Sequence, residues 1–178
     1  MQKIGIGLLV LLGLGVVAGL VMPTTYAIER EVTIDATPAQ VHEFVGHLEK
    51  WPEWAPWQKH DETLETVLGD KTTGIGASQS WSGKDGEGEL TLTQCDASTG
   101  IAYDMAFING DVRAPSTCAM NYTQEGSKTK VSWTMEGDFS DMMPPVLSGL
   151  MAPLTKSMIG GFFDEGLQDL KVKVETSK

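Results

Sequence analysis

The chain has 178 residues, of which 41% are hydrophobic and 21% charged, so it is long and apolar enough to form an ordered domain with a sizeable core. Its net charge of −11 disfavours binding to nucleic-acid phosphates, and we expect no nucleic-acid partner. The two cysteines, Cys95 and Cys118, show no metal-binding spacing, and we expect neither a metal nor a cofactor.

An uninterrupted run of apolar residues and glycines covers residues 4–22. Its length matches a hydrocarbon core of about 30 Å, whereas the apolar core of a signal peptide is shorter, and Thr25-Tyr26-Ala27 is a poor cleavage site. We therefore expect residues 1–23 to be an uncleaved transmembrane anchor rather than a signal peptide, and residues 24–178 to be the folded domain. Lys3 is the only charge before the run, so the positive-inside rule places the domain outside the cytoplasm.

Residues 26–35 alternate apolar and polar side chains, as a strand with one solvated face does. The next segment begins with Thr37-Pro38-Ala39-Gln40, in which threonine suits the N-cap, proline the first helical position and glutamine the reciprocal capping position. The helical spacing of the apolar residues that follow predicts one short amphipathic helix, which ends before Pro52.

The sequence WPEWAPW at residues 51–57 places three of the five tryptophans in one loop. Its two prolines prevent a continuous helix. Three large rings must nevertheless pack against something. Either they close one end of the hydrophobic core, or some of them line the mouth of a pocket.

Six short segments between residues 61 and 140 have the alternation of strands and are separated by turn sequences such as Asn109-Gly110. Together with residues 26–35 they predict seven antiparallel strands. The six segments are residues 61–68, 76–82, 88–96, 101–109, 115–124 and 129–138. Alternation places one set of side chains on the covered face of the sheet: Leu90, Leu92, Ile101, Tyr103, Met105, Phe107, Cys118, Met120, Tyr122, Val131, Trp133 and Met135.

Apolar residues recur at helical spacing between residues 146 and 174 and predict one broad stripe that the rest of the chain must cover. Because Pro153 lacks an N–H group, we expect a short lead-in helix after Pro144-Pro145 and a main helix of about 20 residues that starts near Pro153. The stripe consists of Leu147, Leu150, Met151, Leu154, Met158, Phe162, Phe163, Leu167, Leu170 and Val174.

This order of elements resembles the polyketide cyclase/dehydrase branch of the START-like (SRPBCC, Bet v 1-like) superfamily over residues 26–175. The segments that carry the resemblance are EREVTIDATP at residues 29–38, the WPEWAPW loop, and GFFDEGLQDLK at residues 161–171. The resemblance implies an α+β helix-grip fold, in which a seven-stranded antiparallel sheet wraps around a long C-terminal helix and leaves an apolar cavity between them. Here an N-terminal transmembrane helix would precede that fold, as in bacterial membrane members. Lipid carriers, steroid carriers and polyketide cyclases all share this fold, so the fold alone does not select an activity.

The cavity implied by the resemblance would be rich in methionine and tryptophan, which suits a small hydrophobic ligand, although the same residues also fill ordinary cores. The expected partner is therefore a lipid-like or polyketide-like molecule. The candidate ligand-binding residues are Trp54, Trp57, Trp81, Leu92, Tyr103, Met105, Phe107, Met120, Tyr122, Trp133, Met135, Met143, Leu147, Met151 and Met158.

We expect no catalytic residues, because the sequence contains no hydrolase motif and few polar groups face inward. Residues 138–145, which lead into the closing helix, are the expected lid of the cavity. The inward polar groups could equally satisfy backbone groups in the core. They are Tyr103, Tyr122, Gln79 and Arg113.

The leading hypothesis is a single-pass protein of a bacterial cytoplasmic membrane, with its START-like domain on the extracytoplasmic side, that binds a small apolar or amphipathic ligand. The first alternative is a polyketide cyclase/dehydratase-like enzyme. The second is a membrane-tethered interaction domain without a cavity. The sequence leaves the oligomeric state open.

Overall fold

The computed structural model of the protein describes residues 13–84, 86–140 and 142–177. Residues 13–21 form a helix that precedes the domain. Residues 1–12, the first part of the expected anchor, lie outside the described residues.

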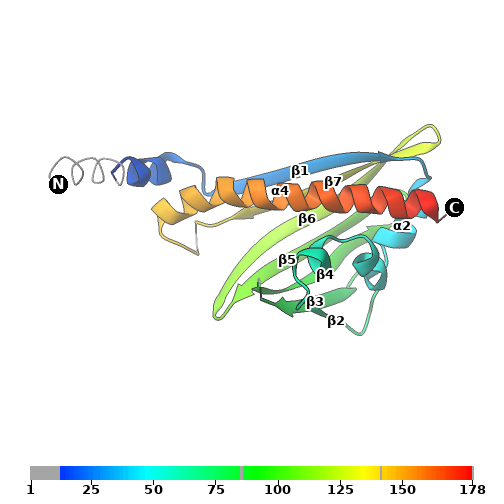
Figure 1. Ribbon diagram of the computed structural model, residues 1–178, viewed down its shortest axis with the longest axis horizontal. Coiled ribbons are helices and arrows are strands. Elements are labelled where there is room, and N and C mark those ends of the chain that lie inside the picture. The colour runs from blue at the N-terminus through cyan, green and yellow to red at the C-terminus, as the bar shows by residue number, and fades with distance from the viewer. Residues whose placement is uncertain (1–12, 85, 141, 178) are drawn as a thin grey trace.

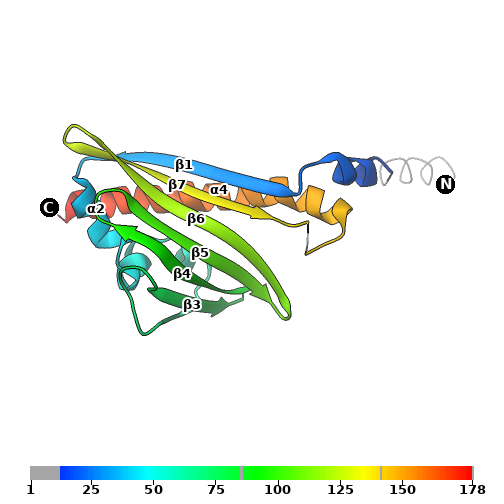
Figure 2. The same cartoon turned by 180° about the vertical axis from the view of Figure 1, so that it is seen from behind.

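The domain is built on a seven-stranded antiparallel sheet, which confirms the predicted strand count, in the order β1-β7-β6-β5-β4-β3-β2. Strands that are consecutive in sequence are neighbours, except that the first strand pairs with the last. The sheet curves around one long helix, α4 (Pro145–Thr176), as Figure 1 and Figure 2 show from opposite sides. The strands are β1 (Thr25–Ile34), β2 (Glu65–Leu68), β3 (Ser78–Gly83), β4 (Gly86–Asp96), β5 (Gly100–Asn109), β6 (Val112–Glu125) and β7 (Lys128–Asp138).

The first helix of the domain, α2 (Pro38–Val45), begins with the predicted capping box. The side-chain oxygen of Gln40 accepts the Thr37 N–H at 2.9 Å, and the Thr37 hydroxyl accepts the Gln40 N–H at 3.4 Å. The prediction that this helix runs on to Pro52 was wrong. His47 takes an extended conformation and forms a bridge with Thr73, so the chain starts again as a 3-10 helix, η1 (Leu48–Glu53).

The prediction that Pro153 separates two helices was also wrong, because α4 is continuous over 32 residues. A proline inside a helix removes one hydrogen bond, here the bond from residue 153 to the Gly149 carbonyl. The neighbouring Ser148 and Ala152 are buried, so packing holds this turn in place. Among the described residues, α4 is the one helix long and apolar enough to cross a membrane, and in this fold it lies along the sheet.

The hydrophobic core lies between the sheet and the C-terminal half of α4, and all of its buried residues lie between Tyr26 and Val174. The covered face predicted from alternation is confirmed for the strands: Leu92, Tyr103 and Trp133 are at most 2% exposed. Phe107, near the end of β5 that leads into β6, is the exception, because its side chain is 36% exposed. Residues 13–21, the described part of the preceding helix, contribute no side chain to this core.

The predicted stripe on α4 is covered only in part. Its last four members, from Phe163 to Val174, are buried and Phe162 is half-buried, whereas Leu147, Met151, Leu154 and Met158 are 36–65% exposed. The first turns of α4 instead meet the helix of residues 13–21. A Cβ atom added at Gly149 would clash with the Gly19 carbonyl oxygen, so the two backbones touch at this point.

Candidate functional site

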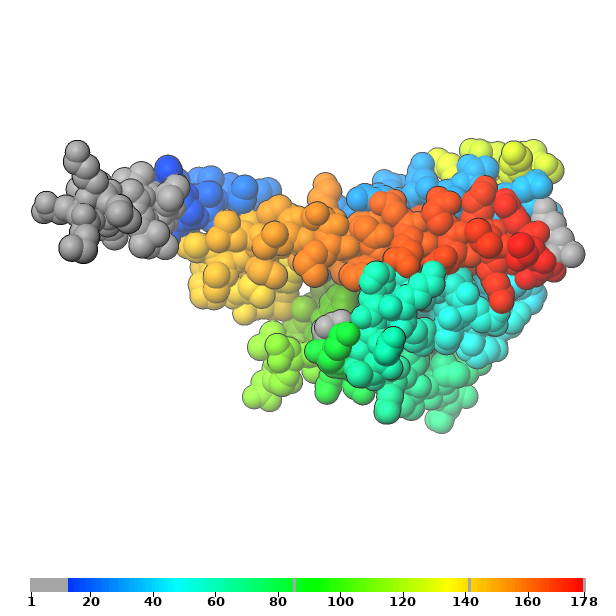
Figure 3. All heavy atoms as spheres, in the orientation of Figure 1, coloured from blue at the N-terminus to red at the C-terminus, as the bar shows by residue number. Residues whose placement is uncertain are grey.

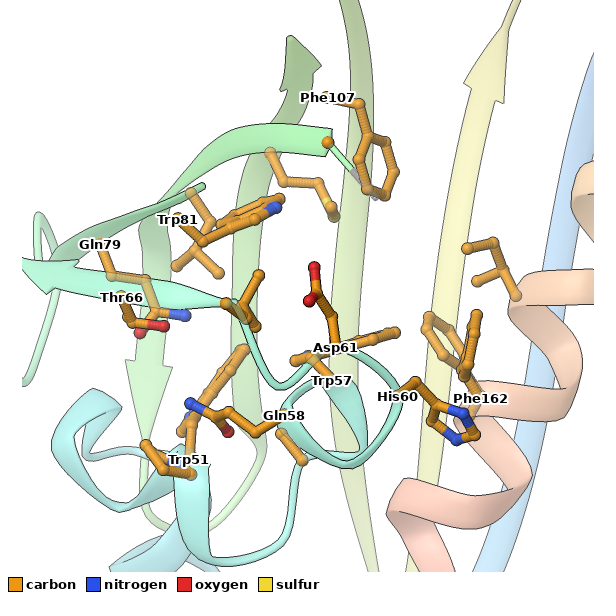
Figure 4. A pocket seen from close by; sticks show the side chains of 18 of the residues that line it. Trp51, Trp57, Gln58, His60, Asp61, Thr66, Gln79, Trp81, Phe107 and Phe162 are labelled. Atoms are coloured by element: carbon orange, nitrogen blue, oxygen red, sulfur yellow. The ribbon is translucent and has the colours of Figure 1, made fainter. Parts of the chain in front are cut away.

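A cavity of about 540 Å³ opens between the sheet and α4. Its walls come from η1, the short helix α3 (Trp57–His60), strands β2 to β5, β7 and the middle of α4. Most of the lining is apolar or aromatic, and Figure 4 shows these side chains converging on one space. Figure 3 shows the surface hollowed between the first half of α4 and the β5–β6 hairpin.

Stacked aromatic rings support the cavity from behind. Trp133 of β7 lies parallel to Phe163 of α4, with ring centroids 3.9 Å apart and planes 6° apart. Trp54 meets Trp133 edge-on at 5.7 Å. Such contacts add to the hydrophobic stabilisation of large buried rings, so this wall is a well-packed part of the core.

The tryptophan loop serves both purposes that its sequence left open. Trp54 is 1% exposed and packs wholly in the core, while Trp51 and Trp57 line the cavity. The buried indole of Trp51 donates its N–H to the Val45 carbonyl at 2.9 Å. The end of α2 thereby fixes the orientation of this loop, because a buried indole N–H needs an acceptor.

Helices α3 and α4 meet on one side of the cavity through aromatic contacts. Phe162 packs against Trp57, with centroids 5.5 Å apart, and against the half-exposed His60 at 4.9 Å. His60 Nε2 lies 2.7 Å from a carboxylate oxygen of Glu165. The hydrogen bond from His60 lowers the pKa of Glu165. Contacts between α3 and α4 at the protein surface therefore close this side of the cavity.

Tyr103 of β5 is 2% exposed and contributes to the lining of the cavity. Its oxygen accepts the Trp133 indole N–H at 2.9 Å, and burial raises the pKa of Tyr103 well above its ordinary range. The phenol therefore stays neutral at physiological pH. Tyr103 thus does not supply a phenolate base.

Asp61, Thr66 and Gln79 form the polar part of the lining on the β2–β3 side. Asp61 is 4% exposed, and its Oδ1 accepts hydrogen bonds from the Thr63 N–H at 2.9 Å and the Thr63 hydroxyl at 2.6 Å. Figure 4 shows the Asp61 carboxylate pointing into the space between Trp57 and Trp81. A carboxylic side chain thus borders a mostly apolar cavity.

The fifteen candidate ligand-binding residues divide into three groups. Seven of them line the cavity: Trp57, Trp81, Tyr103, Met105, Phe107, Met135 and Met158. Five are buried in the core behind it: Trp54, Leu92, Met120, Tyr122 and Trp133. Three lie outside the lining near the start of α4: Met143, Leu147 and Met151.

Two further expectations differ from the structure. Arg113 points outward and pairs with Glu89, so it is not an inward polar group. The described residues of the 138–145 segment do not border the cavity as a lid, because Phe139 is buried in the core and Met143 packs against it. The Ser148 hydroxyl donates to the Phe139 carbonyl at 3.0 Å and helps to hold this loop.

Sequence reasoning missed Asp61 and Phe162 as lining residues. Residues 61–68 were expected to be one strand, but β2 begins only at Glu65, after a turn closed by Asp61 and Thr63. Aspartate two residues before threonine is a recognised turn signal and could have indicated this. In the described part of the chain, no group of three or more histidine, cysteine or acidic side chains is placed to hold a metal ion.

Comparison with solved structures shows that the fold is widespread. Protein CV1439 from Chromobacterium violaceum shares 14% identity at a TM-score of 0.60, over 84% of this chain and 96% of that one. A Thermobifida fusca protein solved by NMR shares 22% identity at a TM-score of 0.58, over 83% and 92%. DynU16, from the dynemicin biosynthetic locus, shares 14% identity at a TM-score of 0.59, over 85% of this chain and 48% of its own. At these identities the likeness establishes the fold.

The sequence itself matches a family profile over residues 25–175, described as polyketide cyclase/dehydrase and lipid transport. No curated protein sequence matches the chain. The matched range begins at the first residue of β1 and ends within the last turn of α4, so it covers the whole domain. This confirms the resemblance noted from the tryptophan loop and the closing helix. The chain belongs to the polyketide cyclase/dehydrase and lipid transport family, within the START-like superfamily.

Proposed function

We propose that the domain binds a small apolar or amphipathic molecule in the cavity between its sheet and α4, without reacting with it. The observation that carries this proposal is the cavity of about 540 Å³, bounded mainly by aromatic and aliphatic side chains. Pockets for small molecules have volumes of about 300–1,000 Å³ and a similar apolar lining with a few polar groups.

The cavity also disfavours the alternative of an interaction domain with no internal site. The cyclase-like alternative depends on Tyr103, the tyrosine of the lining, whose phenol would have to act as a proton donor to a substrate. DynU16, which shares the fold, belongs to a biosynthetic locus, so an enzymatic role is retained as the alternative. If Tyr103→Phe abolished conversion of a substrate while ligand binding remained, the enzyme hypothesis would replace ours.

The proposal includes attachment to a bacterial cytoplasmic membrane through residues 4–22, with the domain on the extracytoplasmic side. The described end of this segment is helical and carries exposed Val16, Val17, Leu20 and Val21. It contacts the first turns of α4 at Gly19 and Gly149, next to the exposed apolar residues of that helix. Continuity of these apolar surfaces supports one shared bilayer contact.

Membrane attachment is tested by fractionating cells that express the full chain or residues 24–178. We expect the full chain to stay in the membrane pellet after an alkaline carbonate wash, because about 19 apolar residues span the hydrocarbon core. Residues 24–178 should be found in the supernatant. Release of the full chain by carbonate would rule out a spanning anchor.

Ligand binding is tested on residues 24–178, which contain the whole core. The neutral dye Nile red should bind and become fluorescent. Met105→Trp adds a large ring to the cavity lining and should weaken dye binding by about tenfold or more, because the space is filled. Met151→Trp, the same change outside the lining, is the matched control and should bind like the parent. Equal binding by both variants and the parent would place the dye elsewhere.

A further inference from the structure

A very short linker joins the apolar N-terminal segment to the domain. The helix of residues 13–21 ends three residues before β1 begins at Thr25. Three residues extend over about 10 Å at most. The Phe139 N–H, just after β7, also donates to the Thr24 carbonyl at 3.1 Å and fastens the linker to the sheet. A domain attached through residues 4–22 therefore stays at the membrane surface, with this end toward the bilayer.

The first turns of α4 lie beside the N-terminal segment, close to the end of its apolar run. A Cβ atom at Gly19 would clash with the Val146 carbonyl oxygen, and one at Gly149 would clash with the Gly19 carbonyl oxygen, so the two backbones touch. Gly19 comes three residues before Met22, where the apolar run ends, which is about 5 Å along a helix. Helices that lie in a membrane interface bury their apolar face by about 5–10 Å. The contact thus places the start of α4 at the depth of the interface.

The charge of α4 changes where its burial changes. Between residues 142 and 163 the sequence has one charged side chain, Lys156, and no acid, whereas residues 164–175 carry six charges. Leu147 and Leu154, in the nearly uncharged part, are 52% and 55% exposed. An exposed apolar stripe with so little charge, next to a membrane segment, fits the bilayer interface as its partner.

The mouth of the cavity opens on the same side of the domain. Met158 of α4 and Phe107 of β5 both line the cavity and are partly exposed, and Val112, just after the β5–β6 turn, is 50% exposed. Figure 3 shows the hollow between the first half of α4 and this hairpin. In Figure 1 the tip of the hairpin and the start of α4 both lie toward the N-terminal helix. Exposed apolar side chains therefore border the mouth on α4 and on the hairpin.

We propose that the first turns of α4 insert into the bilayer interface beside the N-terminal segment, and that the mouth of the cavity, between Met158 and the β5–β6 hairpin, faces the bilayer. This inference rests on the proposed function and specifies the partner surface of the same site. An apolar ligand dissolved in the bilayer then reaches the cavity with little exposure to water. The short linker keeps the domain at the membrane that holds it, so it receives ligand there and does not carry it to another membrane.

The test measures the depth of two positions on α4 in the full chain, reconstituted in phosphatidylcholine vesicles. Leu147→Cys and Val172→Cys each carry the fluorophore NBD, and Val172 is the matched control because it is aliphatic, 61% exposed and near the other end of the helix. About 37 Å of helix separates the two positions. We expect lipids with a nitroxide near the top of the acyl chain to quench NBD at residue 147 about threefold or more strongly than at residue 172.

The same measurement examines the other side of the mouth. NBD on Val112→Cys should be quenched by lipids with a head-group nitroxide about twofold or more strongly than NBD on Thr123→Cys. Thr123 is exposed on the same strand, β6, about 36 Å farther along it. All four proteins also carry Cys95→Ser, while Cys118 is 1% exposed and should not react. A protein without an introduced cysteine measures any residual labelling.

Quenching at residue 147 no stronger than at residue 172, or at residue 112 no stronger than at residue 123, would overturn the inference. Blue-shifted emission at residue 147 without nitroxide quenching would also overturn it, because protein, such as a second copy of the chain, would then cover α4. None of these measurements involves the cavity ligand, so Nile red binding by residues 24–178 stands or falls separately. Release of the full chain by carbonate would remove the attachment and this inference together.

Discussion

The two halves of α4 carry the same apolar periodicity but lie in different surroundings. In the C-terminal half, Phe163, Leu167, Leu170 and Val174 are at most 2% exposed, while the N-terminal half leaves Leu147, Leu154 and Met158 more than half exposed. The C-terminal half is covered by α2 and the sheet, whereas the first turns meet the helix of residues 13–21. Periodicity therefore identifies side chains that share a face, but not whether anything covers that face.

Polar contacts with β1 and the turn after it also distinguish the C-terminal half of α4 from its N-terminal half. The Glu175 carboxylate accepts the Asp35 backbone N–H at 2.8 Å, and Arg30 pairs with Asp164 at 2.9 Å. A Cβ atom at Gly160 would clash with the Arg30 guanidinium, so this glycine makes room for that pair. The C-terminal half is thus fastened to β1 and the turn after it, and it carries most of the stability that α4 contributes.

The largest expected effect is the difference between two identical substitutions on α4. Leu167→Ala should lower the free energy of unfolding by about 2–5 kcal/mol, because it opens a cavity in the core. Leu154→Ala should change it by about 0.5 kcal/mol or less, because Leu154 is 55% exposed. Urea denaturation of residues 24–178 measures both. Similar losses would show that the N-terminal half is also packed.

A second prediction concerns the turn between the halves. Pro153→Ala should raise the free energy of unfolding by about 1–3 kcal/mol, since it restores one helical hydrogen bond and removes a helix breaker. Pro145→Ala is the matched control at the first helical position, where proline is well tolerated, and should have little effect. The same denaturation series compares them. A loss of stability in Pro153→Ala would mean that the fold needs the proline at this point.

The smallest effect is a pH dependence that resides in the C-terminal half. The hydrogen bond from the Asp35 backbone, helped by Lys171, holds the pKa of Glu175 below its ordinary value of 4.5. The carboxylate therefore stabilises the fold above pH 4.5, and this contribution is lost as the pH falls through the lower folded pKa. Glu175→Gln should flatten this part of the stability curve, measured by thermal unfolding between pH 2 and 7. The exposed Glu62→Gln is the control, and a curve unchanged by Glu175→Gln would contradict the assignment.

Most of the fold could be predicted from local chemistry. The alternation in the strands, the turn residues between them and the Thr37 cap are short-range signals, and the structure agrees with them. The break at His47 and the continuity through Pro153 depend on tertiary contacts, the bridge to Thr73 and the packing of Ser148 and Ala152. Sequence spacing does not contain those contacts.

The cavity could be predicted less well than the fold. Strand alternation correctly placed Tyr103, Met105 and Met135 on the covered face, but it does not tell how deep along the strand the core ends and the cavity begins. Trp133 and Met120 share that face and lie in the core. Asp61 was not predicted as a lining residue because the turn that contains it was interpreted as part of a strand. The polar part of the lining therefore became clear only from the three-dimensional arrangement.

The pairing of β1 with β7 also governs the order in which the domain can be made. β1 leaves the ribosome directly after the apolar N-terminal segment, but its partner is the last strand to be synthesised. The strands from β2 to β7 can form successive hairpins before β1 has a partner. The pairing of β1 with β7 joins distant segments, and such contacts form slowly. Glu29, Arg30 and Glu31 give the waiting strand charges of the kind that protect an exposed sheet edge from wrong pairing. Because α4 is completed after β7, the chain can close its core only when synthesis is nearly finished.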